Sequence, residues 1–574
     1  MVINMSVPRN EYPRPQLVRK DWINLNGAWD FEIDDSFCGQ AKKYQLRNSL
    51  NDKIIVPFCP ESKLSGVQHT DFISCVWYRK NIEIPTKWMS KNIILHFGAV
   101  DYHSTVYVNG EYIGEHKGGY TSFCFDITKF LREKENYITI CAKDDLRSNN
   151  QPSGKQSPEL NSFGCFYTRT TGIWQTVWLE CVSTNYIKGI KTTTDIETCS
   201  VSFEIRLSDN SVGCKIKSKV YFNGEQVGES ATTVYSFSAN LNILLAEKHL
   251  WDVGQGNLYD VIFTVEKGNE VTDTVDSYFG LRSIGLSDKA FLLNGRKVFG
   301  RWVLDQGFYP DGIYTAPNDE ALKDDIIKSM QLGFNGARLH EKVFEPRFLY
   351  WADKLGYLVW GEHANWGLDI TEFTQLEHFL PEWMEAVERD FNHPSIIGWC
   401  PFNETWDFNW RRQNDILLRT VYNITKAMDS TRPVIDTSGN FHGITDIYDI
   451  HDYNQSVEQF SSHYINGVYN NFEDRQSYKD QPYFVSEYGG IKWSIDETQG
   501  WGYGDSPKTE KEFIERYKGL TEALLNDICV IGFCYTQLYD VEQELNGLMT
   551  YSREFKFNPE IIKAINTQKA VIEE

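Results

Sequence analysis

Short runs of alternating hydrophobic and polar residues, separated by turn signals, fill the first half of the chain. Examples are IILHFGAV, STVYVNGEYIGEH with its Asn109-Gly110 dipeptide, and WQTVWLE. A period of two is typical of strands with one buried face, and Asn-Gly favours a hairpin turn. The pattern predicts a jelly-roll β-sandwich over residues 1–182. The same texture, as in VSFEIRLSD and LYDVIFTVEKG, continues over residues 183–284, a length that suits one immunoglobulin-like sandwich.

After residue 288 the periodicity becomes helical. In residues 318–332, Leu322, Ile326 and Met330 fall on one helix face, and Gly333 follows as a C-terminal cap. Other helices are predicted to begin at Pro346 and Pro381 and to cover 415–428 and 510–526. Candidate parallel strands lie between the helices at 298–304, 335–340, 357–361, 396–403, 432–436, 446–451, 483–487 and 530–538.

Eight such strands predict a (β/α)8 barrel over residues 285–574. The connection between the fifth and sixth strands, FHGITD, is too short for a helix, which an irregular barrel accommodates better than a doubly wound sheet. The expected architecture is therefore multidomain, with a jelly roll, an immunoglobulin-like sandwich and a C-terminal barrel.

Composition and charge narrow the classes of partner. The formal net charge is −22, so the chain lacks the basic excess that phosphate backbones require, and we expect no nucleic-acid partner. No segment approaches the roughly 18 apolar residues that cross a bilayer, and the N-terminus carries no apolar signal region. The twelve cysteines form no C-x-x-C motif, which argues against a zinc site or a disulfide framework. We expect a reducing, cytoplasmic setting and no membrane partner.

Polar side chains follow the ends of the predicted barrel strands, where barrel enzymes hold their active sites. Glu404 ends the apolar run IIGWCPFN, and Glu487 ends PYFVS. Two carboxylates at one cavity can divide the work of acid and nucleophile or base, as glycoside hydrolysis requires. A Glu at the end of one strand is often only solvated or salt-bridged, but two on separate strands within a polar ring favour catalysis.

Several motifs resemble glycoside hydrolase family 2, the family of β-galactosidases, β-glucuronidases and β-mannosidases. NHPSIIGWCPFNETW resembles its acid/base signature, PYFVSEYGG its nucleophile strand, TTGIWQTVWLE the end of its sugar-binding jelly roll, and RKDWINLNGAWDFEID its opening. The similarity runs from about residue 12 to 560 in the expected domain order.

The resemblance implies a retaining mechanism and assigns roles. Glu404 would be the acid/base and Glu487 the nucleophile, while Asn403 would bind the 2-hydroxyl of the sugar. Tyr453, in DIHDYNQ, matches a tyrosine that hydrogen-bonds the nucleophile, and Arg338, in NGARLH, an arginine that keeps it ionised.

Some positions depart from the family pattern. The Asn-x-Lys pair with which β-glucuronidases bind a carboxylate falls on Glu544 and Asn546, which disfavours glucuronides. Asp305 stands where the first strand usually ends in Asn-(Arg/Lys)-His-Glu. GEHANWG lacks the metal ligands of long β-galactosidases, so no metal and no cofactor are expected.

The sequence leaves more than one candidate for the residues that contact the substrate. His340 and His363 are as compatible with a supporting role as with contacting the sugar. Tyr535 is the candidate for stacking after the last strand, with Gln537 or Asp540 meeting hydroxyls. Trp366 and Trp493 are further candidate sugar platforms, although each is as consistent with packing.

These observations predict an exo-acting retaining β-glycosidase, β-galactosidase-like, with a small carbohydrate or glycoconjugate substrate. A β-glucuronidase or another β-hexosidase or pentosidase of the same fold is the alternative within the enzyme class. A carbohydrate-binding protein with an inactive barrel is the alternative outside it. No P-loop, dinucleotide fingerprint or serine elbow supports another chemistry. The family often forms dimers or tetramers, so a homo-oligomer is left open.

Overall fold

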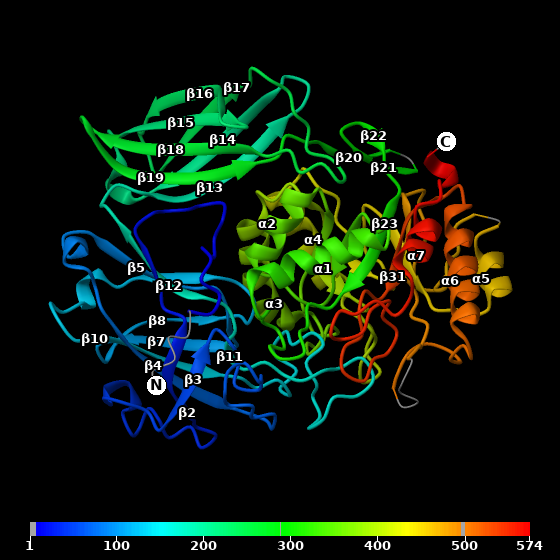
Figure 1. Ribbon diagram of the computed structural model, residues 1–574, viewed down its shortest axis with the longest axis horizontal. Helices are drawn as coiled ribbons and strands as arrows, with labels where there is room; N and C mark the ends of the chain where they lie inside the picture. The colour runs from blue at the N-terminus through cyan, green and yellow to red at the C-terminus, as the bar shows by residue number, and fades with distance from the viewer. Residues whose placement is uncertain (1–6, 288, 466, 495–499, 574) are drawn as a thin grey trace.

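A computed structural model describes residues 7–287, 289–465, 467–494 and 500–573, and it contains the three predicted architectures (Figure 1). The N-terminal part is a jelly roll with sheets ordered β1-β12-β5-β9 and β3-β2-β4-β10-β7-β8, and a small β11-β6 pair. Its strands are β1 (Trp22–Asn24), β2 (Gly27–Ile33), β3 (Asp52–Val56), β4 (Cys75–Ile82), β5 (Asn92–Phe97), β6 (Val100–Asp101), β7 (His103–Val108), β8 (Glu111–Lys117), β9 (Phe123–Asp126), β10 (Asn136–Lys143), β11 (Gly172–Ile173) and β12 (Val177–Val182).

The second part is an immunoglobulin-like sandwich that lies beside the jelly roll in Figure 1. Its two sheets have the orders β13-β14-β17 and β16-β15-β18-β19. The buried positions of β14 and β18 alternate with more exposed ones, as the period of two predicted. The strands are β13 (Ile187–Asp195), β14 (Ser200–Leu207), β15 (Lys215–Phe222), β16 (Glu225–Thr233), β17 (Ser238–Leu244), β18 (Tyr259–Lys267) and β19 (Glu270–Phe279).

The C-terminal part is the barrel, preceded by a small β20-β21-β22 sheet. Seven parallel strands have the order β26-β25-β24-β23-β31-β30-β29, and β27 pairs in parallel with β28. The strands are β20 (Ile284–Ser287), β21 (Ala290–Leu293), β22 (Arg296–Lys297), β23 (Gly300–Asp305), β24 (Gly336–Leu339), β25 (Leu358–Glu362), β26 (Ile396–Cys400), β27 (Phe402–Asn403), β28 (Thr437–Ser438), β29 (Tyr448–Asp452), β30 (Tyr483–Gly489) and β31 (Val530–Thr536).

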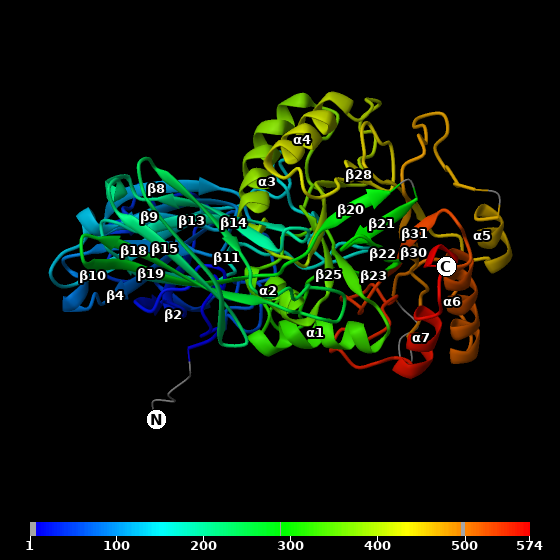
Figure 2. The ribbon, with the colours of Figure 1, turned by 90° about the horizontal axis from the view of Figure 1, so that it is seen from above.

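Helices cover the outside of the barrel, with α3 and α4 on one side and α6 and α7 on another (Figure 2). The sequence predicted α1 and α4 closely, but it placed the start of α3 at Pro381, inside the helix. Burial of Phe379 and Trp383 keeps this helix together around the proline. The helices are α1 (Asp319–Gln331), α2 (Pro346–Leu355), α3 (Leu376–Asp390), α4 (Asp415–Met428), α5 (Val457–His463), α6 (Glu510–Leu525) and α7 (Pro559–Asn566). None of the described helices is both long and apolar enough to cross a membrane.

The fifth barrel strand differs from its predicted position at 432–436. Residue Val434 makes only an isolated bridge with Trp399, and the strand proper is β28 at 437–438. Asp436 explains the shift, because its carboxylate accepts the N–H groups of Thr437, Gly443 and Ile444 and so bends the chain. No helix separates β28 from β29, as the short connection predicted.

Large aromatic rings fill one end of the barrel. The rings of Trp302 and Trp360 meet edge to face with centroids 6.0 Å apart, and Trp302 meets Phe484 at 4.9 Å. Glycines on β23 and β31 make this possible, since a Cβ at Gly300 would lie 2.0 Å from the Trp302 ring and one at Gly532 would lie 2.5 Å from it. The interior of the barrel is therefore a packed core at this end.

Candidate active site

The two carboxylates that the sequence singled out lie together at the C-terminal ends of the barrel strands. Glu404 directly follows β27, and Glu487 lies within β30. Glu404 has a φ of 46°, a left-handed conformation that Ser438 supports by accepting the Glu404 N–H at 2.9 Å. One oxygen of each carboxylate and Nδ1 of His451 lie within 4.8 Å of one another. This spacing brings the two carboxylates to a single reaction centre.

Arg338, on β24, connects three acidic or amide groups beneath this centre. Its guanidinium donates to Glu362 Oε1 at 2.5 Å, to Glu487 Oε1 at 3.1 Å and to Asn403 Oδ1 at 3.2 Å. Burial would lower the pKa of Arg338, but the charges of Glu362 and Glu487 raise it well above its usual value. The Arg338 guanidinium therefore pairs with the Glu487 carboxylate and orients Asn403, whose Nδ2 has no hydrogen-bond partner among the described residues.

Tyr453 approaches Glu487 from the other side. Its hydroxyl donates to Glu487 Oε2 at 2.5 Å and lies 3.0 Å from Thr536 Oγ1. The ring stacks on Tyr503 with centroids 3.5 Å apart. Each Glu487 oxygen is thus hydrogen-bonded, one by Arg338 and one by Tyr453, which fixes the orientation of the carboxylate.

His451, at the end of β29, lies between the two carboxylates. Its Nδ1 is 2.7 Å from Glu404 Oε1 and 3.3 Å from Glu487 Oε2, and its Nε2 contacts Ser438 Oγ at 3.1 Å. Burial would lower the pKa of His451, but the charges of Glu487 and Glu404 raise it above its usual value. Burial alone would raise the pKa of Glu404, but the hydrogen bond and charge of His451 lower it. Each member of the pair therefore favours the charged form of the other.

A lysine from the jelly roll enters the same pocket. The Lys155 side chain is buried, and its Nζ lies 3.6 Å from the centroid of the Trp366 ring. Burial would lower the pKa of Lys155, but the acidic groups around it, among them Glu404, Glu487 and Glu544, raise it. The described residues place no hydrogen-bond acceptor on Nζ, so its N–H groups are left for a ligand.

Glu544, Asn546 and Gln537 form a connected polar network after β31. The Glu544 carboxylate accepts from the Tyr167 hydroxyl, which comes from the jelly roll, and from Asn546 Nδ2 at 2.8 Å. Asn546 Oδ1 in turn accepts from Gln537 Nε2 at 2.9 Å, while Gln537 Oε1 has no partner among the described residues. Burial raises the pKa of Glu544 to about 7, so this carboxyl changes charge near neutrality.

Other predicted site residues take supporting or unrelated positions. His340 is buried, 3.4 Å from Glu362 and 3.8 Å from Glu487, and burial lowers its pKa well below the usual range. The Trp366 indole donates to the Asn403 backbone at 3.2 Å, which puts it beside the acid/base as well as under Lys155.

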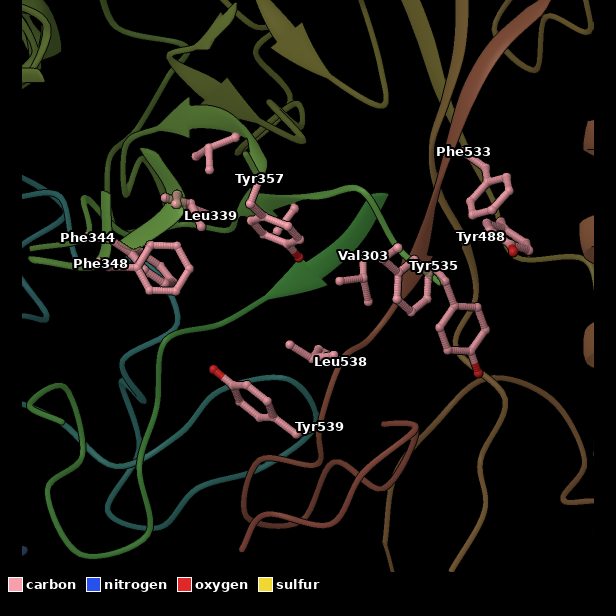
Figure 3. Close-up of a cluster of buried hydrophobic side chains, with 14 of the residues drawn as sticks. Val303, Leu339, Phe344, Phe348, Tyr357, Tyr488, Phe533, Tyr535, Leu538 and Tyr539 are labelled. Atoms are coloured by element: carbon pink, nitrogen blue, oxygen red, sulfur yellow. The ribbon is translucent and has the colours of Figure 1, made fainter. Parts of the chain in front are cut away.

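Three predicted contacts are not brought to the carboxylate pair. Tyr535 is fully buried and packs against Tyr488 and Tyr517, as its place in Figure 3 among core side chains shows. Trp493 packs against Phe513 and Phe557. Asp305 accepts from the Gly307 N–H at 2.9 Å and from the Tyr539 hydroxyl, and so closes a turn after β23. Burial raises the pKa of Asp305 to about 6.

Position in the sequence explains what was missed. His451 stood among the polar residues that end the strands, but nothing in its neighbourhood predicted contact with both carboxylates. Lys155 and Tyr167 lie about 250 and 240 residues before Glu404 in the chain, in an irregular stretch of the jelly roll. No local pattern indicates that such a stretch reaches the mouth of the barrel.

Comparison with known families agrees with this geometry. Residues 23–179 match the sugar-binding domain of the glycosyl hydrolases family 2, residues 185–282 match its second domain, and residues 284–519 match its TIM barrel domain. The chain belongs to glycosyl hydrolases family 2.

Its relatives carry more than one specificity. A β-galactosidase from Thermoanaerobacterium thermosulfurigenes is 29% identical over 493 residues, covering 82% of this chain and 64% of that protein. A β-glucuronidase from Streptococcus agalactiae is 25% identical over 422 residues, covering 67% of each. The chain thus spans about two thirds of the length of these relatives.

Solved structures with the same fold include β-glucuronidases. One from an uncultured Clostridium sp. superposes with a TM-score of 0.81 at 21% identity, covering 96% of this chain and 99% of that one. Another, from Lactobacillus rhamnosus, has a TM-score of 0.82 at 18% identity, covering 98% and 100%. At these identities the likeness extends to the fold.

Proposed function

We propose that this family member is a retaining exo-β-glycosidase that removes a terminal neutral sugar, in the manner of a β-galactosidase. The observation that carries the proposal is the approach of the Glu404 and Glu487 oxygens to within 4.8 Å. Retaining enzymes hold their carboxyl groups about 5–5.5 Å apart, whereas inverting enzymes need about 6.5–9.5 Å to admit a water molecule. These ranges describe whole carboxyl groups, and nearest oxygens within 4.8 Å of each other are compatible with the shorter range, which supports direct attack by one carboxylate.

The reaction proceeds in two displacements. Glu487, held by Arg338 and Tyr453, attacks the anomeric carbon and forms a covalent glycosyl-enzyme bond as the bond to the leaving oxygen breaks. Glu404 gives its proton to that oxygen, and the alcohol departs. Glu404 then takes a proton from water, whose oxygen attacks the anomeric carbon and releases Glu487. The unpartnered Nδ2 of Asn403 is available to the 2-hydroxyl.

His451 both lowers the pKa of Glu404 and can hold a proton beside it. A general acid must hold a proton at the working pH, yet contact with His451 favours the ionised form of the Glu404 carboxyl. A proton on His451 Nδ1, 2.7 Å from Glu404 Oε1, can pass to the carboxylate as negative charge develops on the leaving oxygen. The acid is therefore the Glu404–His451 pair, which titrates as a unit.

Glu544 supports the choice of a neutral sugar. A sugar hydroxyl can donate to a carboxylate and accept from an ammonium group at once, so Glu544 and Lys155 together suit hydroxyl recognition. The carboxylate of a uronic acid would meet repulsion from Glu544, Glu404 and Glu487, with Lys155 as the opposing cation.

A β-glucuronidase is the second candidate, and Lys155 is the observation that favours it. The sequence argument against glucuronides rested on the lack of a cation after the last strand. Lys155 supplies a cation from another domain, with Nζ free of protein acceptors among the described residues. The pocket is then able to hold an anionic sugar if Glu544 is protonated, which its pKa of about 7 allows.

Initial rates on nitrophenyl β-glycosides test the proposal. The panel includes galactoside, glucoside, mannoside, fucoside, arabinopyranoside and glucuronide, with Glu487→Gln and Glu404→Gln beside the wild type. The exposed Glu515→Gln on α6 is the matched control. We expect the galactoside to dominate, Glu487→Gln to abolish turnover, and Glu404→Gln to impair substrates with poor leaving groups most.

The other outcomes choose between the alternatives. A dominant glucuronide rate that collapses in Lys155→Met identifies the second candidate. A dominant rate on another neutral sugar keeps the mechanism and changes the specificity. No turnover of any substrate, together with calorimetric binding of free sugars, indicates a carbohydrate-binding protein with an inactive barrel.

A further inference from the structure

An aromatic hairpin, residues 405–412, begins directly after the acid/base Glu404. The Trp406 N–H donates to the Glu404 carbonyl at 3.0 Å, so the hairpin leaves the site with no spacer. Since Glu404 protonates the leaving oxygen, the hairpin lies on the side of the pocket from which the leaving group departs.

Three large rings of this hairpin are exposed. The exposed fractions are 51% for Trp406, 44% for Phe408 and 105% for Trp410. Single apolar residues at a protein surface need no explanation, but three large rings within five residues beside a catalytic group form a patch. Such a patch is typical of a surface that binds a ligand.

The hairpin is held rigidly from both sides. Phe408 and Arg411 exchange backbone hydrogen bonds at 3.0 and 2.9 Å, and the two residues at the tip, Asn409 and Trp410, have φ values of 49° and 66°. Arg411 pairs with Asp369 and donates to Thr371 Oγ1 at 2.9 Å. On the other side Asp407 accepts from Arg475 at 2.8 Å.

The Trp410 ring is not stabilised by packing, although its backbone has a left-handed conformation. A left-handed conformation at a bulky residue is unfavourable, and a fully exposed ring recovers no free energy from burial. A small residue such as Gly or Asn would suit the turn better. The ring is thus explained by a ligand that covers it rather than by the fold.

Trp406 continues the patch toward the barrel. Its ring meets Phe441 and Phe472 edge to face, with centroids 5.8 and 6.2 Å away. Phe441 in turn lies under the guanidinium of Arg475, 3.9 Å from the ring centroid. This support leaves half of the Trp406 surface free while it fixes the orientation of the ring.

We propose that the aromatic hairpin is an aglycone subsite, where the leaving group rests its flat apolar face, either a further sugar ring or an aromatic ring. The proposal rests on the glycosidase function proposed above. Trp406, next to Glu404, receives the first ring of the aglycone. Trp410, at the hairpin tip, receives a later ring, so only extended aglycones reach it.

A substrate series with one terminal sugar and four aglycones tests the subsite. The aglycones are methyl, nitrophenyl, one sugar and two sugars, and the sugar is the one the wild type prefers. The variants are Trp410→Asn, which keeps a residue suited to the left-handed turn, and Trp406→Leu. Tyr235→Ala on the immunoglobulin-like sandwich, where 83% of Tyr235 is exposed, is the control. For each substrate, kcat/KM of the variant is divided by kcat/KM of the wild type, which removes the effect of the different reactivities of the leaving groups.

We expect Trp410→Asn to lower kcat/KM about threefold to tenfold for the two-sugar aglycone and to leave the methyl glycoside unchanged, as the loss of one stacking contact implies. Trp406→Leu should also affect the nitrophenyl and one-sugar substrates. A larger loss with nitrophenyl than with one sugar identifies an aromatic ligand, and the reverse identifies a carbohydrate.

Equal ratios of variant to wild-type kcat/KM for all four aglycones would overturn the proposed subsite, even if the variants are fully active. A change in sedimentation of Trp410→Asn with equal ratios would instead identify the hairpin as a contact between copies of the chain, and the proposal would again be wrong. Absence of wild-type turnover on all four substrates refutes the glycosidase function itself. The two failures are therefore distinguishable.

Discussion

The proton between His451 and Glu404 defines the chemistry at the scale of single residues. The imidazole and the carboxylate are 2.7 Å apart and most of each side chain is buried, so each favours the charged form of the other. Arg338 and Tyr453 meanwhile satisfy the two oxygens of Glu487. In the proposed mechanism the site thus separates a fixed nucleophile from a proton donor that exchanges its proton with a neighbour.

His451→Asn should change the pH dependence of substrates that need acid assistance. In the wild type the alkaline limb of kcat/KM reports loss of the proton from the pair, at a pKa raised above the ordinary 6.5 of histidine. In the variant the proton is held by the Glu404 carboxyl alone, whose ordinary pKa is about 4.3, so the limb should move to lower pH, by an amount that burial of this carboxyl reduces. Values of kcat/KM for substrates with poor leaving groups, recorded over pH 4–9, measure this shift of the alkaline limb.

The dinitrophenyl glycoside is the control for this variant, because its leaving group departs without a proton and its alkaline limb should not move. An alkaline limb that stays in place for poor leaving groups would mean that Glu404 holds its proton without His451.

The sequence identified single residues where a motif carried them. Glu404, Glu487, Asn403, Arg338 and Tyr453 come together in the structure, and each lies at the end of a strand whose apolar run made its position readable. Tyr535 was the candidate for stacking on the sugar, but alternation within β31 directs its ring toward α6. The sequence of a strand that is buried on both faces does not indicate which side chains point into the barrel. His451 gave no local signal of its two carboxylate partners.

At the scale of elements, the irregular strand β28 and the loop after it support the acid. Asp436, Asp449 and Ser438 are buried here, and Ser438 Oγ bonds both Asp449 and His451. His442 stands between the two aspartates, with Nδ1 2.7 Å from Asp436 and Nε2 3.2 Å from Asp449 Oδ1. The sequence predicted that no helix follows β28. It did not predict this charged cluster, because the alternation of hydrophobic and polar residues carries no information on loop conformation.

His442→Gln should destabilise the fold in a pH-dependent way. Burial lowers the pKa of His442, but the two aspartates raise it to about 10 in the folded chain. Its stabilisation is fully present below the unfolded pKa of about 6.5 and is lost as pH rises through 10. Removal of one partner of a buried ion pair costs about 3–5 kcal/mol, so urea unfolding at pH 6 should show a large loss that shrinks by pH 10.

His103→Gln, at a half-buried histidine of the jelly roll, serves as the control for urea unfolding and should change stability little at any pH. A loss in His442→Gln that is the same at pH 6 and pH 10 would contradict a protonated His442 in the folded protein.

At the scale of the whole molecule, the jelly roll completes the pocket of the barrel. Lys155 and Tyr167 reach it from a stretch between β10 and β11, and α3 fixes the two domains together. Glu382 on that helix accepts the N–H groups of Tyr120 and Thr121 at 2.6 and 3.2 Å. The motifs predicted the order of the domains, but contacts between domains depend on long-range packing that no local pattern encodes.

Tyr167→Phe should impair catalysis from outside the barrel. Burial raises the pKa of Glu544 and the Tyr167 hydroxyl opposes that rise, so the variant should leave Glu544 more protonated at pH 7. A hydrogen bond to a charged group is worth about 1.5–3 kcal/mol, which predicts a loss of about tenfold or more in kcat/KM on the preferred substrate. Kinetics and thermal unfolding should be measured together.

Tyr112→Phe, at a jelly-roll tyrosine that is 55% exposed, is the control and should match the wild type. Unchanged kcat/KM in a folded Tyr167→Phe would mean that the network around Glu544 does not contact the sugar.

The stereochemistry of the first product tests the central claim most directly. Proton NMR can follow the wild type on its preferred nitrophenyl β-glycoside, before mutarotation mixes the anomers. Two displacements at Glu487 and water predict that the β-anomer appears first and the α-anomer later. An α-anomer that appears first would contradict the covalent glycosyl-enzyme and the nucleophilic role of Glu487.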